Sequence, residues 1–346
     1  MRGMAGCTEA RYWEPEGDGP VRCRLCPHAC LVAPGRRGQC GVRENQGGRL
    51  CALAHGRAIA VHLDPIEKKP LFHVLPGSRS LSVAAAGCNL RCAHCQNHEI
   101  SQLPRGLAGE RGQLPGQDLP PAAAVAAARR AGAATISFTY TEPSVWWEWC
   151  QDIAAAAEGQ GVRCVAVTNG FLEARPLEDM GARLLAANVD LKSFRDEFYR
   201  RTCGARLRPV LDTIQRMRAL EVWVEVTTLL IPGRNDSPAE LGEMAAWLAS
   251  VDRAMPWHLS RFHPDHELMD AAPTPPATIA RAREIGLEAG LRFVYAGNLW
   301  GDEGEHTRCP ACQAVLVRRH GFRVLENRLA GGGACPACGE VLEGRW

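Results

Sequence analysis

The sequence predicts an α/β protein in which a parallel sheet lies between two cysteine-rich flanks. Short apolar segments alternate with amphipathic stretches over residues 80–295, a pattern typical of strands joined by helical crossovers. Most of the 16 cysteines fall outside this stretch or directly after its first segment. A length of 346 residues suits about two domains. We expect an accessory region over residues 1–77, the α/β unit over 78–300 and a small module over 301–346.

The predicted strands are short, largely apolar runs in which valine, a residue that favours extended backbone, is frequent. They are Ser80–Ala86, Thr135–Thr139, Cys164–Thr168, Asn188–Leu191, Val222–Leu230, Trp257–Phe262 and Leu291–Tyr295. Because they alternate with amphipathic helical stretches, they indicate a parallel sheet.

The stretches between these strands predict helices that cover the sheet. They are Pro121–Ala131, Val145–Glu158, Pro176–Ala186, Pro209–Leu220, Pro238–Ser250 and Ala277–Ala289. Several have proline in or near the first turn, where the missing N–H costs nothing because it would have no partner within the helix. Strand and helix thus alternate through the whole unit.

Three cysteines with the spacing C-x3-C-x2-C directly follow the first predicted strand. They are Cys88, Cys92 and Cys95. Three thiolates on one short loop can bind three irons of a [4Fe–4S] cluster and leave the fourth iron without a protein ligand. An open metal position is typical of a catalytic site. The alternatives are a zinc site or three cysteines without a metal, because a short cysteine motif is only a hypothesis.

The C-terminal cysteines form two Cys-Pro-Ala-Cys pairs that predict a zinc ribbon. They are Cys309, Cys312, Cys335 and Cys338. Between them, Ala314–Val317 and Phe322–Leu325 can form short strands around a turn at Arg318–Gly321. Four thiolates complete the tetrahedral shell of zinc, so we predict a structural site. Zinc ribbons also bind nucleic acid or protein, which makes a binding scaffold the alternative class of function.

Four further cysteines lie near the N-terminus on a glycine-rich segment. They are Cys23, Cys26, Cys30 and Cys40. They can hold zinc or a second cluster, and His28 can replace one of them. The remaining cysteines are isolated, and we interpret them as small core residues or surface thiols. They are Cys7, Cys51, Cys150, Cys164 and Cys203.

Composition argues against several partners and locations. The formal net charge is only +2, so the chain lacks the basic surface expected of a nucleic-acid-binding protein. It contains no apolar run of about 18 residues, the length of a membrane span. Met1–Gly19 has no apolar core of a signal peptide, and many cysteines without an export signal favour metal binding over disulfides. We therefore expect a cytoplasmic protein without a membrane or nucleic-acid partner.

Polar residues follow four of the predicted strands, where barrel-like sheets carry their chemistry. These residues are Glu142, Asn169, Asp190, Lys192 and His263. The chain has 37 arginines but only the lysines Lys68, Lys69 and Lys192. A lysine in so arginine-rich a chain is a candidate for a role that the planar guanidinium cannot fill.

These motifs resemble the radical S-adenosylmethionine (SAM) superfamily, in the branch related to pyruvate formate-lyase activating enzymes. Within that branch, the chain is most similar to the AmmeMemoRadiSam system radical SAM enzymes. The resemblance rests on the triplet, the segments Cys23–His28, Asp64–Leu71 and Thr139–Pro143, and the terminal cysteine ribbon. It covers nearly the whole chain.

The resemblance implies an open, partial (β/α) barrel that binds a [4Fe–4S] cluster and SAM. By the same resemblance, Glu142 receives the SAM amino group and Asn169 lies near the ribose. Asp190, Lys192 and His263 match positions that contact the methionine or ribose part. The family's Gly-Gly-Glu is Tyr-Thr-Glu at residues 140–142, so Tyr140 should alter how the backbone approaches SAM.

The activity implied is reductive cleavage of SAM to a 5′-deoxyadenosyl radical, which takes hydrogen from an unidentified substrate. The Asp-Gly-Pro-Gly-x-Arg segment of glycyl-radical activases is absent before the triplet, so activation of a partner enzyme is the alternative. The implied partners are an electron donor such as flavodoxin or ferredoxin, and AMMECR1-like and Memo-like proteins.

Overall fold

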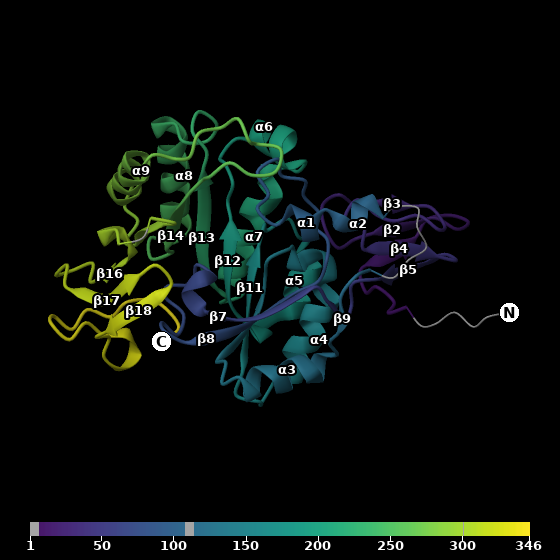
Figure 1. Ribbon diagram of the computed structural model, residues 1–346, viewed down its shortest axis with the longest axis horizontal. Coiled ribbons are helices and arrows are strands. Elements are labelled where there is room, and N and C mark those ends of the chain that lie inside the picture. Colours follow the sequence, from purple (N-terminus) through teal and green to yellow (C-terminus); the bar gives the residue numbers. More distant parts are fainter. Residues whose placement is uncertain (1–6, 108–113, 300) are drawn as a thin grey trace.

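A single large sheet forms the centre of the computed structural model, which describes residues 7–107, 114–299 and 301–346 (Figure 1). This eight-stranded sheet has the order β15-β14-β13-β12-β11-β10-β8-β7. The strands are β7 (Ala60–Pro65), β8 (Arg79–Ala84), β10 (Thr135–Phe138), β11 (Arg163–Thr168), β12 (Leu184–Asp190), β13 (Trp223–Leu230), β14 (Trp257–Arg261) and β15 (Val294–Gly297). Strand β7 pairs antiparallel with β8, and all other neighbours are parallel, which confirms the predicted α/β class.

Helices connect the parallel strands and cover the outer face of the sheet (Figure 1). They are α3 (Pro121–Arg130), α4 (Trp147–Ala157), α5 (Ala174–Met180), α7 (Leu207–Ala219), α8 (Pro238–Val251) and α9 (Pro276–Glu288). Shorter ones are α1 (His98–Ser101), α2 (Leu103–Gly106) and α6 (Asp196–Phe198). The prediction of one helix over Pro176–Ala186 is wrong, because Gly181 adopts a φ of 51° that ends α5 and β12 begins at Leu184.

The inner face of the sheet surrounds the base segment, residues 66–74. Glu225 on β13 accepts a hydrogen bond from the backbone N–H of His73 at 2.8 Å. The His73 ring reaches the Tyr295 hydroxyl on β15 at 2.7 Å, and Asn188 on β12 donates to a carbonyl of the same segment at 2.8 Å. Because three strands contact one short segment, the inner face is concave, as expected of a partial barrel. The base segment closes the end of this barrel opposite the carboxyl ends of the strands.

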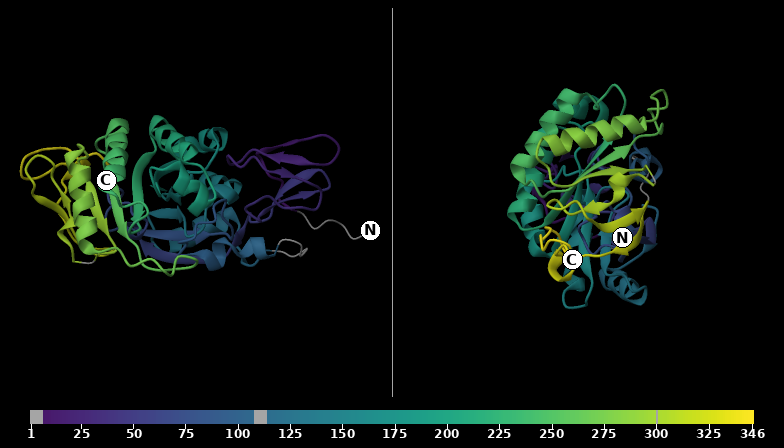
Figure 2. Two further views of the ribbon diagram at one scale, coloured as in Figure 1. Left: turned by 90° about the horizontal axis from the view of Figure 1, so that it is seen from above. Right: turned by 90° about the vertical axis from the view of Figure 1, so that its left-hand side faces the viewer.

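The N-terminal region is a separate group of short strands at one end of the molecule, and the C-terminal strands lie at the other end (Figure 2). The strands of the N-terminal region are β1 (Trp13–Pro15), β2 (Val21–Cys23), β3 (Leu31–Val32), β4 (Arg43–Gln46), β5 (Arg49–Ala52) and β6 (Arg57–Ala58). Strand β6 pairs with β9 (Gln117–Asp118). The three-part division of the chain stays a prediction. However, residues 60–65 of the expected accessory region form β7, the edge strand of the large sheet.

One interpretation of the isolated cysteines is wrong. Cys7 and Cys51 form a disulfide that joins two points of the N-terminal region 44 residues apart in sequence. Sequence spacing did not reveal this pair, because only the fold brings Cys7 beside Cys51 of β5. Cys150 and Cys164 are buried in the core between sheet and helices, as expected of small apolar residues.

The C-terminal module contains a three-stranded antiparallel sheet of β16 (Thr307–Arg308), β17 (Val315–His320) and β18 (Arg323–Asn327). The predicted strand pair is therefore present, although both strands extend further than expected and the turn lies at residues 321–322. Buried side chains of the module pack on Phe72, Phe293 and Tyr295, so it covers the base of the barrel. Within the three described ranges, no helix has the length and apolar character of a membrane span.

Candidate functional site

The three central cysteines lie on a loop, residues 87–97, that follows β8. Gly87 at its start has a φ of 108°, and a Cβ atom there would lie 2.6 Å from Cγ1 of Val42. Glycine is therefore required where the loop passes the N-terminal region. Cys92 is buried, and Cys88 and Cys95 are partly buried.

Hydrogen bonds from two other parts of the chain hold residues 87–97, called the cluster loop below. The Arg105 guanidinium on α2 donates to the carbonyl oxygens of Cys88 and Leu90, both at 3.0 Å. The backbone N–H of Arg91 donates to the carbonyl of Cys203 at 2.9 Å. These contacts fix the loop without using the cysteine sulfur atoms.

A cavity of about 210 Å³ opens beside the loop, at the carboxyl ends of β10 to β14. The predicted site residues that line it are Cys88, Cys92, Cys95, Glu142, Asn169, Asp190 and Lys192. Parallel strands bring their carboxyl ends to one edge of a sheet, so residues far apart in sequence converge there.

The buried carboxylate of Glu142 links the carboxyl ends of β10 and β11 by hydrogen bonds. Its Oε1 atom accepts hydrogen bonds from Ser144 N at 2.9 Å and from the Thr168 hydroxyl at 2.7 Å, and Oε2 accepts from Asn169 N at 2.7 Å. Burial raises the pKa of Glu142 above its ordinary value, although these donors oppose the shift. A carboxylate offers about four acceptor positions, so one more donor can bind.

Asn169 connects the strand end to the cluster loop. Its side-chain Nδ2 donates to Oδ1 of Asn89 at 2.8 Å and lies 3.7 Å from the Cys88 sulfur. Asn89 in turn donates to the carbonyl of Phe171 at 2.8 Å. Asn89 was not singled out by the sequence analysis, although it sits inside the cysteine motif. The network ties the position of the first cysteine to β11.

Asp190 and Lys192 form an ion pair on the wall of the cavity, with Lys192 Nζ 2.9 Å from Asp190 Oδ2. Burial opposes the charged form of the lysine, but the Asp190 carboxylate raises the pKa of Lys192 above its ordinary value. The ammonium therefore stays protonated beside the thiol of a predicted cluster ligand.

Two histidines near the three cysteines differ in their exposure. His263 is exposed beside Gln96, at 3.3 Å, and does not line the cavity, so its contact with SAM stays a prediction. His94, between Cys92 and Cys95, does line the cavity, and burial lowers its pKa to about 3. Its Nδ1 atom is buried and has no hydrogen-bond partner in the described part of the chain.

The donor set at this cavity fits a [4Fe–4S] cluster. The Cys88, Cys92 and Cys95 sulfur atoms do not gather to within 4.8 Å of one another, in contrast to the four C-terminal thiols. Each thiolate of such a cluster binds a different iron, so wider spacing is required than around one zinc ion. The cavity beside the thiols has room for a polar ligand of the fourth iron. The unpaired Nδ1 atom of His94 can form a hydrogen bond there.

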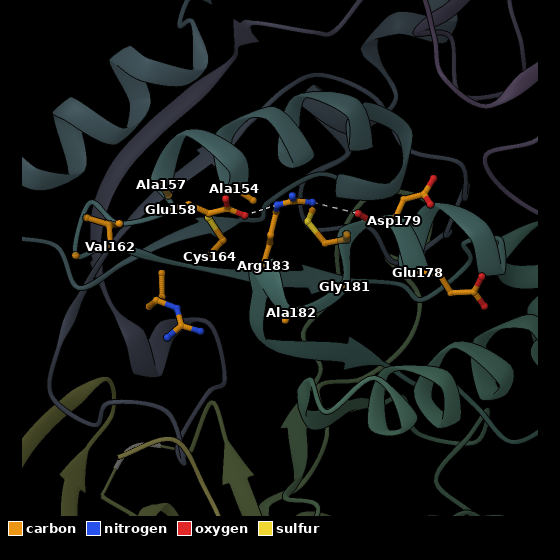
Figure 3. Close-up of a pocket in the computed structure, with 14 residues that line it drawn as sticks. Ala154, Ala157, Glu158, Val162, Cys164, Glu178, Asp179, Gly181, Ala182 and Arg183 are labelled. Carbon is orange, nitrogen blue, oxygen red and sulfur yellow. Dashed lines mark hydrogen bonds and ion pairs between the residues drawn. The ribbon is translucent and has the colours of Figure 1, made fainter.

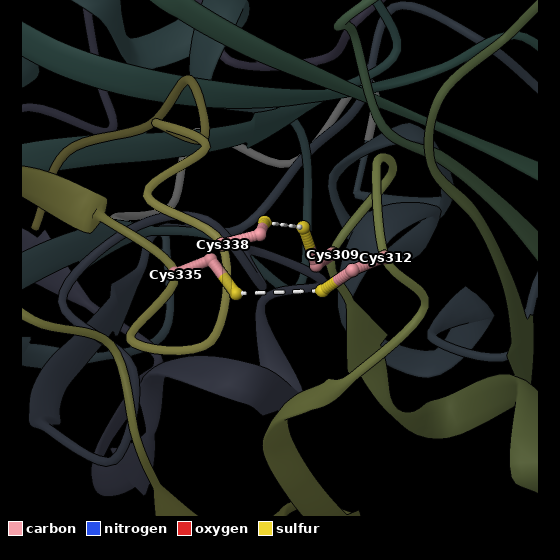
Figure 4. Close-up of side chains that lie close together, drawn as sticks. All are labelled: Cys309, Cys312, Cys335 and Cys338. Atoms are coloured by element: carbon pink, nitrogen blue, oxygen red, sulfur yellow. Dashed lines mark hydrogen bonds between the residues drawn. The ribbon is translucent and has the colours of Figure 1, made fainter.

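The C-terminal thiols converge on one point, as Figure 4 shows. The Cys309 and Cys338 sulfur atoms lie 3.5 Å apart, and those of Cys312 and Cys335 lie 3.7 Å apart. Four ligands at the usual Zn–S distance would be separated by about 3.8 Å. This group can therefore hold a tetrahedral metal ion, as its spacing in the sequence indicated.

The N-terminal thiols lie near one another but do not converge to the same degree. Burial, followed by the thiols of Cys23, Cys40 and Cys30, raises the pKa of Cys26. No three of these four sulfur atoms lie within 4.8 Å of one another. The His28 ring is turned away to the cluster loop, where its Nε2 lies 2.8 Å from the Asn89 carbonyl.

A second hollow lies at the opposite edge of the sheet (Figure 3). It has a volume of about 610 Å³ and is lined by residues that precede β11 and β12. The guanidinium of Arg183 bridges Glu158 and the carbonyl of Asp179 across it. The hollow is open to solvent and holds an exposed ion pair, so it does not share the features of the cysteine-lined cavity.

Thiols on a loop after the first parallel strand, beside a cavity at the strand ends, define a metal-cluster protein of the α/β class. The family described as the Radical SAM superfamily matches residues 83–248. These residues, which include the three thiols and the strand-end groups Glu142, Asn169, Asp190 and Lys192, therefore belong to the radical SAM superfamily.

An uncharacterized protein of Methanocaldococcus jannaschii is 41% identical over 337 residues, which cover 97% of this chain and 98% of that relative. Two solved structures are also similar. A domain of pyruvate-formate lyase-activating enzyme from Bacteroides vulgatus is 20% identical, with a TM-score of 0.41, and covers 47% of this chain and 98% of that chain. SuiB of Streptococcus suis, bound to S-adenosylmethionine, is 12% identical, with a TM-score of 0.49. The match covers 64% of this chain and 51% of SuiB.

Proposed function

We propose that the protein is an enzyme that reductively cleaves SAM at a [4Fe–4S] cluster held by Cys88, Cys92 and Cys95. The observation that carries the proposal is the shared cavity: the three thiols and the charged strand-end groups line the same space. When bound together, the cluster and SAM supply a 5′-deoxyadenosyl radical and methionine. The protein binds, orients and shields these groups.

The side chains around the cavity suit the two ends of the SAM methionine moiety. Glu142 has a free acceptor position for the SAM amino group, and the Lys192 ammonium can face the SAM carboxylate. We propose that Asn169, which donates a hydrogen bond to Asn89, also contacts the ribose hydroxyls. Asp190 holds the lysine in position at 2.9 Å.

We propose that the radical takes hydrogen from a substrate that binds beside SAM at the carboxyl ends of the strands. Activation of a partner enzyme at a glycine is the alternative, based on the resemblance to activating enzymes. The proposed partners are a flavodoxin or ferredoxin as electron donor, and AMMECR1-like and Memo-like proteins. The proposed location is the cytoplasm.

We further propose that the C-terminal group binds zinc and that the N-terminal group binds a second metal centre. The sulfur separations of 3.5 and 3.7 Å support zinc at the C-terminus. Metal and sulfide analysis of purified protein tests both sites. Additional inorganic sulfide that survives removal of the central triplet would identify a cluster at the N-terminal group, and a second zinc equivalent would identify zinc there.

The decisive experiment is anaerobic reconstitution followed by incubation with SAM and a low-potential reductant. Wild-type protein should produce 5′-deoxyadenosine and methionine, because slow cleavage needs no substrate. A variant with Cys88, Cys92 and Cys95 replaced by Ala should produce neither, while it keeps its C-terminal zinc. A substrate deuterated at the reacting carbon should transfer deuterium to 5′-deoxyadenosine.

The proposal fails if fully reconstituted wild-type protein yields no more 5′-deoxyadenosine than the triple variant. The alternative of a zinc-ribbon scaffold would then be tested by nucleic-acid binding. Binding through phosphate contacts should weaken steeply with added salt. A protein partner offers no phosphate backbone, so its binding should not weaken as steeply with added salt.

A further inference from the structure

Tyr140 occupies a backbone conformation that tyrosine seldom adopts. Its φ is 65°, in the left-handed region, and it stands two residues before Glu142 at the edge of the cavity. Side chains other than glycine disfavour this region because Cβ approaches the following carbonyl oxygen. Such a conformation persists only where surrounding contacts enforce it, and it often marks a functional position.

The contacts that enforce it come from Asp64 and Lys69. The Tyr140 hydroxyl donates to Oδ2 of Asp64, and Lys69 Nζ donates to the same oxygen at 2.8 Å. The Lys69 ammonium also lies 4.5 Å from the centre of the Tyr140 ring. Lys68 donates to the other oxygen, Oδ1, at 3.0 Å. The Tyr140 phenol is thus held by Asp64 at its hydroxyl and by the Lys69 ammonium at its ring.

Asp64 and Lys69, the anchor of the Tyr140 side chain, are themselves held in place. Asp64 is the next-to-last residue of the edge strand β7, and the Lys69 side chain is only 2% exposed. Lys69 belongs to the base segment, residues 66–74, which Glu225 and Asn188 hold inside the barrel. The Tyr140 side chain therefore connects the cavity to the closed end of the barrel.

The backbone after Tyr140 connects to the cluster loop. Thr141 N donates to the carbonyl of Thr139 at 2.8 Å, and the Thr141 hydroxyl donates to the carbonyl of Ala85 at 2.6 Å. Glu142 N donates to the carbonyl of Gly87 at 3.3 Å, one residue before the first cysteine. A change in φ at residue 140 would move Glu142 relative to the cluster loop.

We propose that Asp64, assisted by Lys69, is a positioning residue for SAM binding. It holds the Tyr140 side chain so that the backbone keeps the left-handed turn that presents Thr141 and Glu142 to SAM. The inference rests on the proposed function. It explains why Asp64 and Lys69 lie within one segment, Asp64–Leu71, and why tyrosine can stand where the conformation favours glycine.

The test compares Tyr140→Ala with Tyr140→Gly. Both variants lose every phenol contact, but only glycine adopts a φ of 65° without strain. SAM affinity of anaerobically reconstituted protein is measured by calorimetry, and cluster content is measured as iron and sulfide. The alanine variant should bind SAM about five- to thirtyfold more weakly. This factor corresponds to the free-energy cost of the left-handed backbone conformation for a residue other than glycine. The glycine variant should bind within about twofold of wild type, by the same reasoning.

Asp64→Asn tests the anchor itself. It should weaken SAM binding in the wild-type background and have no effect in the Tyr140→Gly background, because glycine needs no anchor. A second readout needs no cofactor: in the absence of cluster and SAM, Tyr140→Gly should melt at a higher temperature than Tyr140→Ala. This comparison remains informative if a single variant assembles poorly.

Equal weakening by alanine and glycine would overturn the proposal, since it would show that the phenol acts by direct contact with SAM or substrate. Wild-type affinity of Asp64→Asn would overturn the role of Asp64. Failure of wild-type protein to bind SAM would instead refute the proposed function. The two failures are thus distinguishable.

Discussion

Arg43 and Glu148 form a buried ion pair with two parallel hydrogen bonds, each 2.9 Å long. Their side chains are 2% and 1% exposed. Arg43 begins β4 of the N-terminal region and Glu148 lies in the first turn of α4. The backbone N–H of Arg11 donates to the same carboxylate at 3.0 Å. This pair joins the N-terminal region to the helix that follows Glu142.

We predict that Glu148→Gln lowers the free energy of unfolding by about 3–5 kcal/mol, because it leaves the Arg43 charge buried without its counter-ion. Although burial opposes ionisation, Arg43 lowers the pKa of Glu148 below its ordinary value. The stabilisation is therefore complete above the unfolded-state pKa and disappears as the pH falls through the lower folded-state pKa. Denaturant unfolding at several pH values measures both effects.

The matched control is Glu243→Gln. Glu243 also makes two hydrogen bonds to an arginine, Arg195, but both side chains are about half exposed. Exposed pairs contribute about 0–1 kcal/mol, so this variant should remain near wild type. Similar losses in the two variants would contradict the argument that burial decides the effect.

The sequence predicted the sheet well because parallel strands carry a strong signal. The segment Cys164–Thr168 carries apolar side chains on both faces, and it lies within β11. The end of α5 was missed, since Gly181 occurs inside an otherwise helical pattern. The long-range pair Cys7–Cys51 was missed because no local pattern encodes a contact between distant segments.

The site shows the same limit. Cys88, Glu142 and Lys192 could be predicted because motif spacing and strand ends place them, and the structure brings them to one cavity. The hydrogen bonds of Asp64 to Tyr140 could not be predicted, because β7 was not recognised as part of the sheet. The position of His263 depends on a loop conformation that periodicity does not determine.

We predict that SAM affinity falls as the pH decreases through the raised pKa of Glu142. Only the ionised carboxylate can pair with the SAM ammonium, and burial places this titration above the ordinary value of 4.5. Calorimetric titration of reconstituted protein from pH 8 downward measures the effect. Glu142→Gln should bind SAM more weakly at neutral pH and lack the pH dependence.

The control for this prediction is the iron and sulfide content at each pH. Affinity is compared only where the cluster is fully assembled. A Glu142→Gln variant with the same pH profile as wild type would assign the titration to another group. An unchanged affinity at neutral pH would remove Glu142 from the SAM site.

We predict that Lys192→Met weakens SAM binding about ten- to a hundredfold, which corresponds to the loss of a charge-assisted hydrogen bond. The methionine side chain has a similar length but no charge. Arg281→Met, which removes an exposed cation on α9, is the control and should bind SAM normally. Loss of the cluster in Lys192→Met, rather than loss of SAM binding alone, would instead assign the lysine to cluster stability.

The last prediction concerns the C-terminal metal site and the base of the barrel. Cys335→Ser should release zinc, because three thiolates no longer complete the tetrahedron. Arg319 on β17 donates to the carbonyl of Phe72 at 2.9 Å and lies 4.1 Å from its ring centre. Loosening the module should therefore also loosen the base segment, residues 66–74.

Hydrogen exchange measured by mass spectrometry checks this coupling. Exchange in Cys335→Ser should accelerate in residues 66–74 as well as in 307–346, while the iron and sulfide content of the central site stays at the wild-type value. Cys164→Ala, which removes a buried thiol from β11, is the control and should retain zinc. Zinc loss without faster exchange in the base segment would show that the buried Arg319 contact does not transmit the change. Loss of the central cluster together with zinc would show that the module also supports the cluster loop, which lies at the opposite end of the strands.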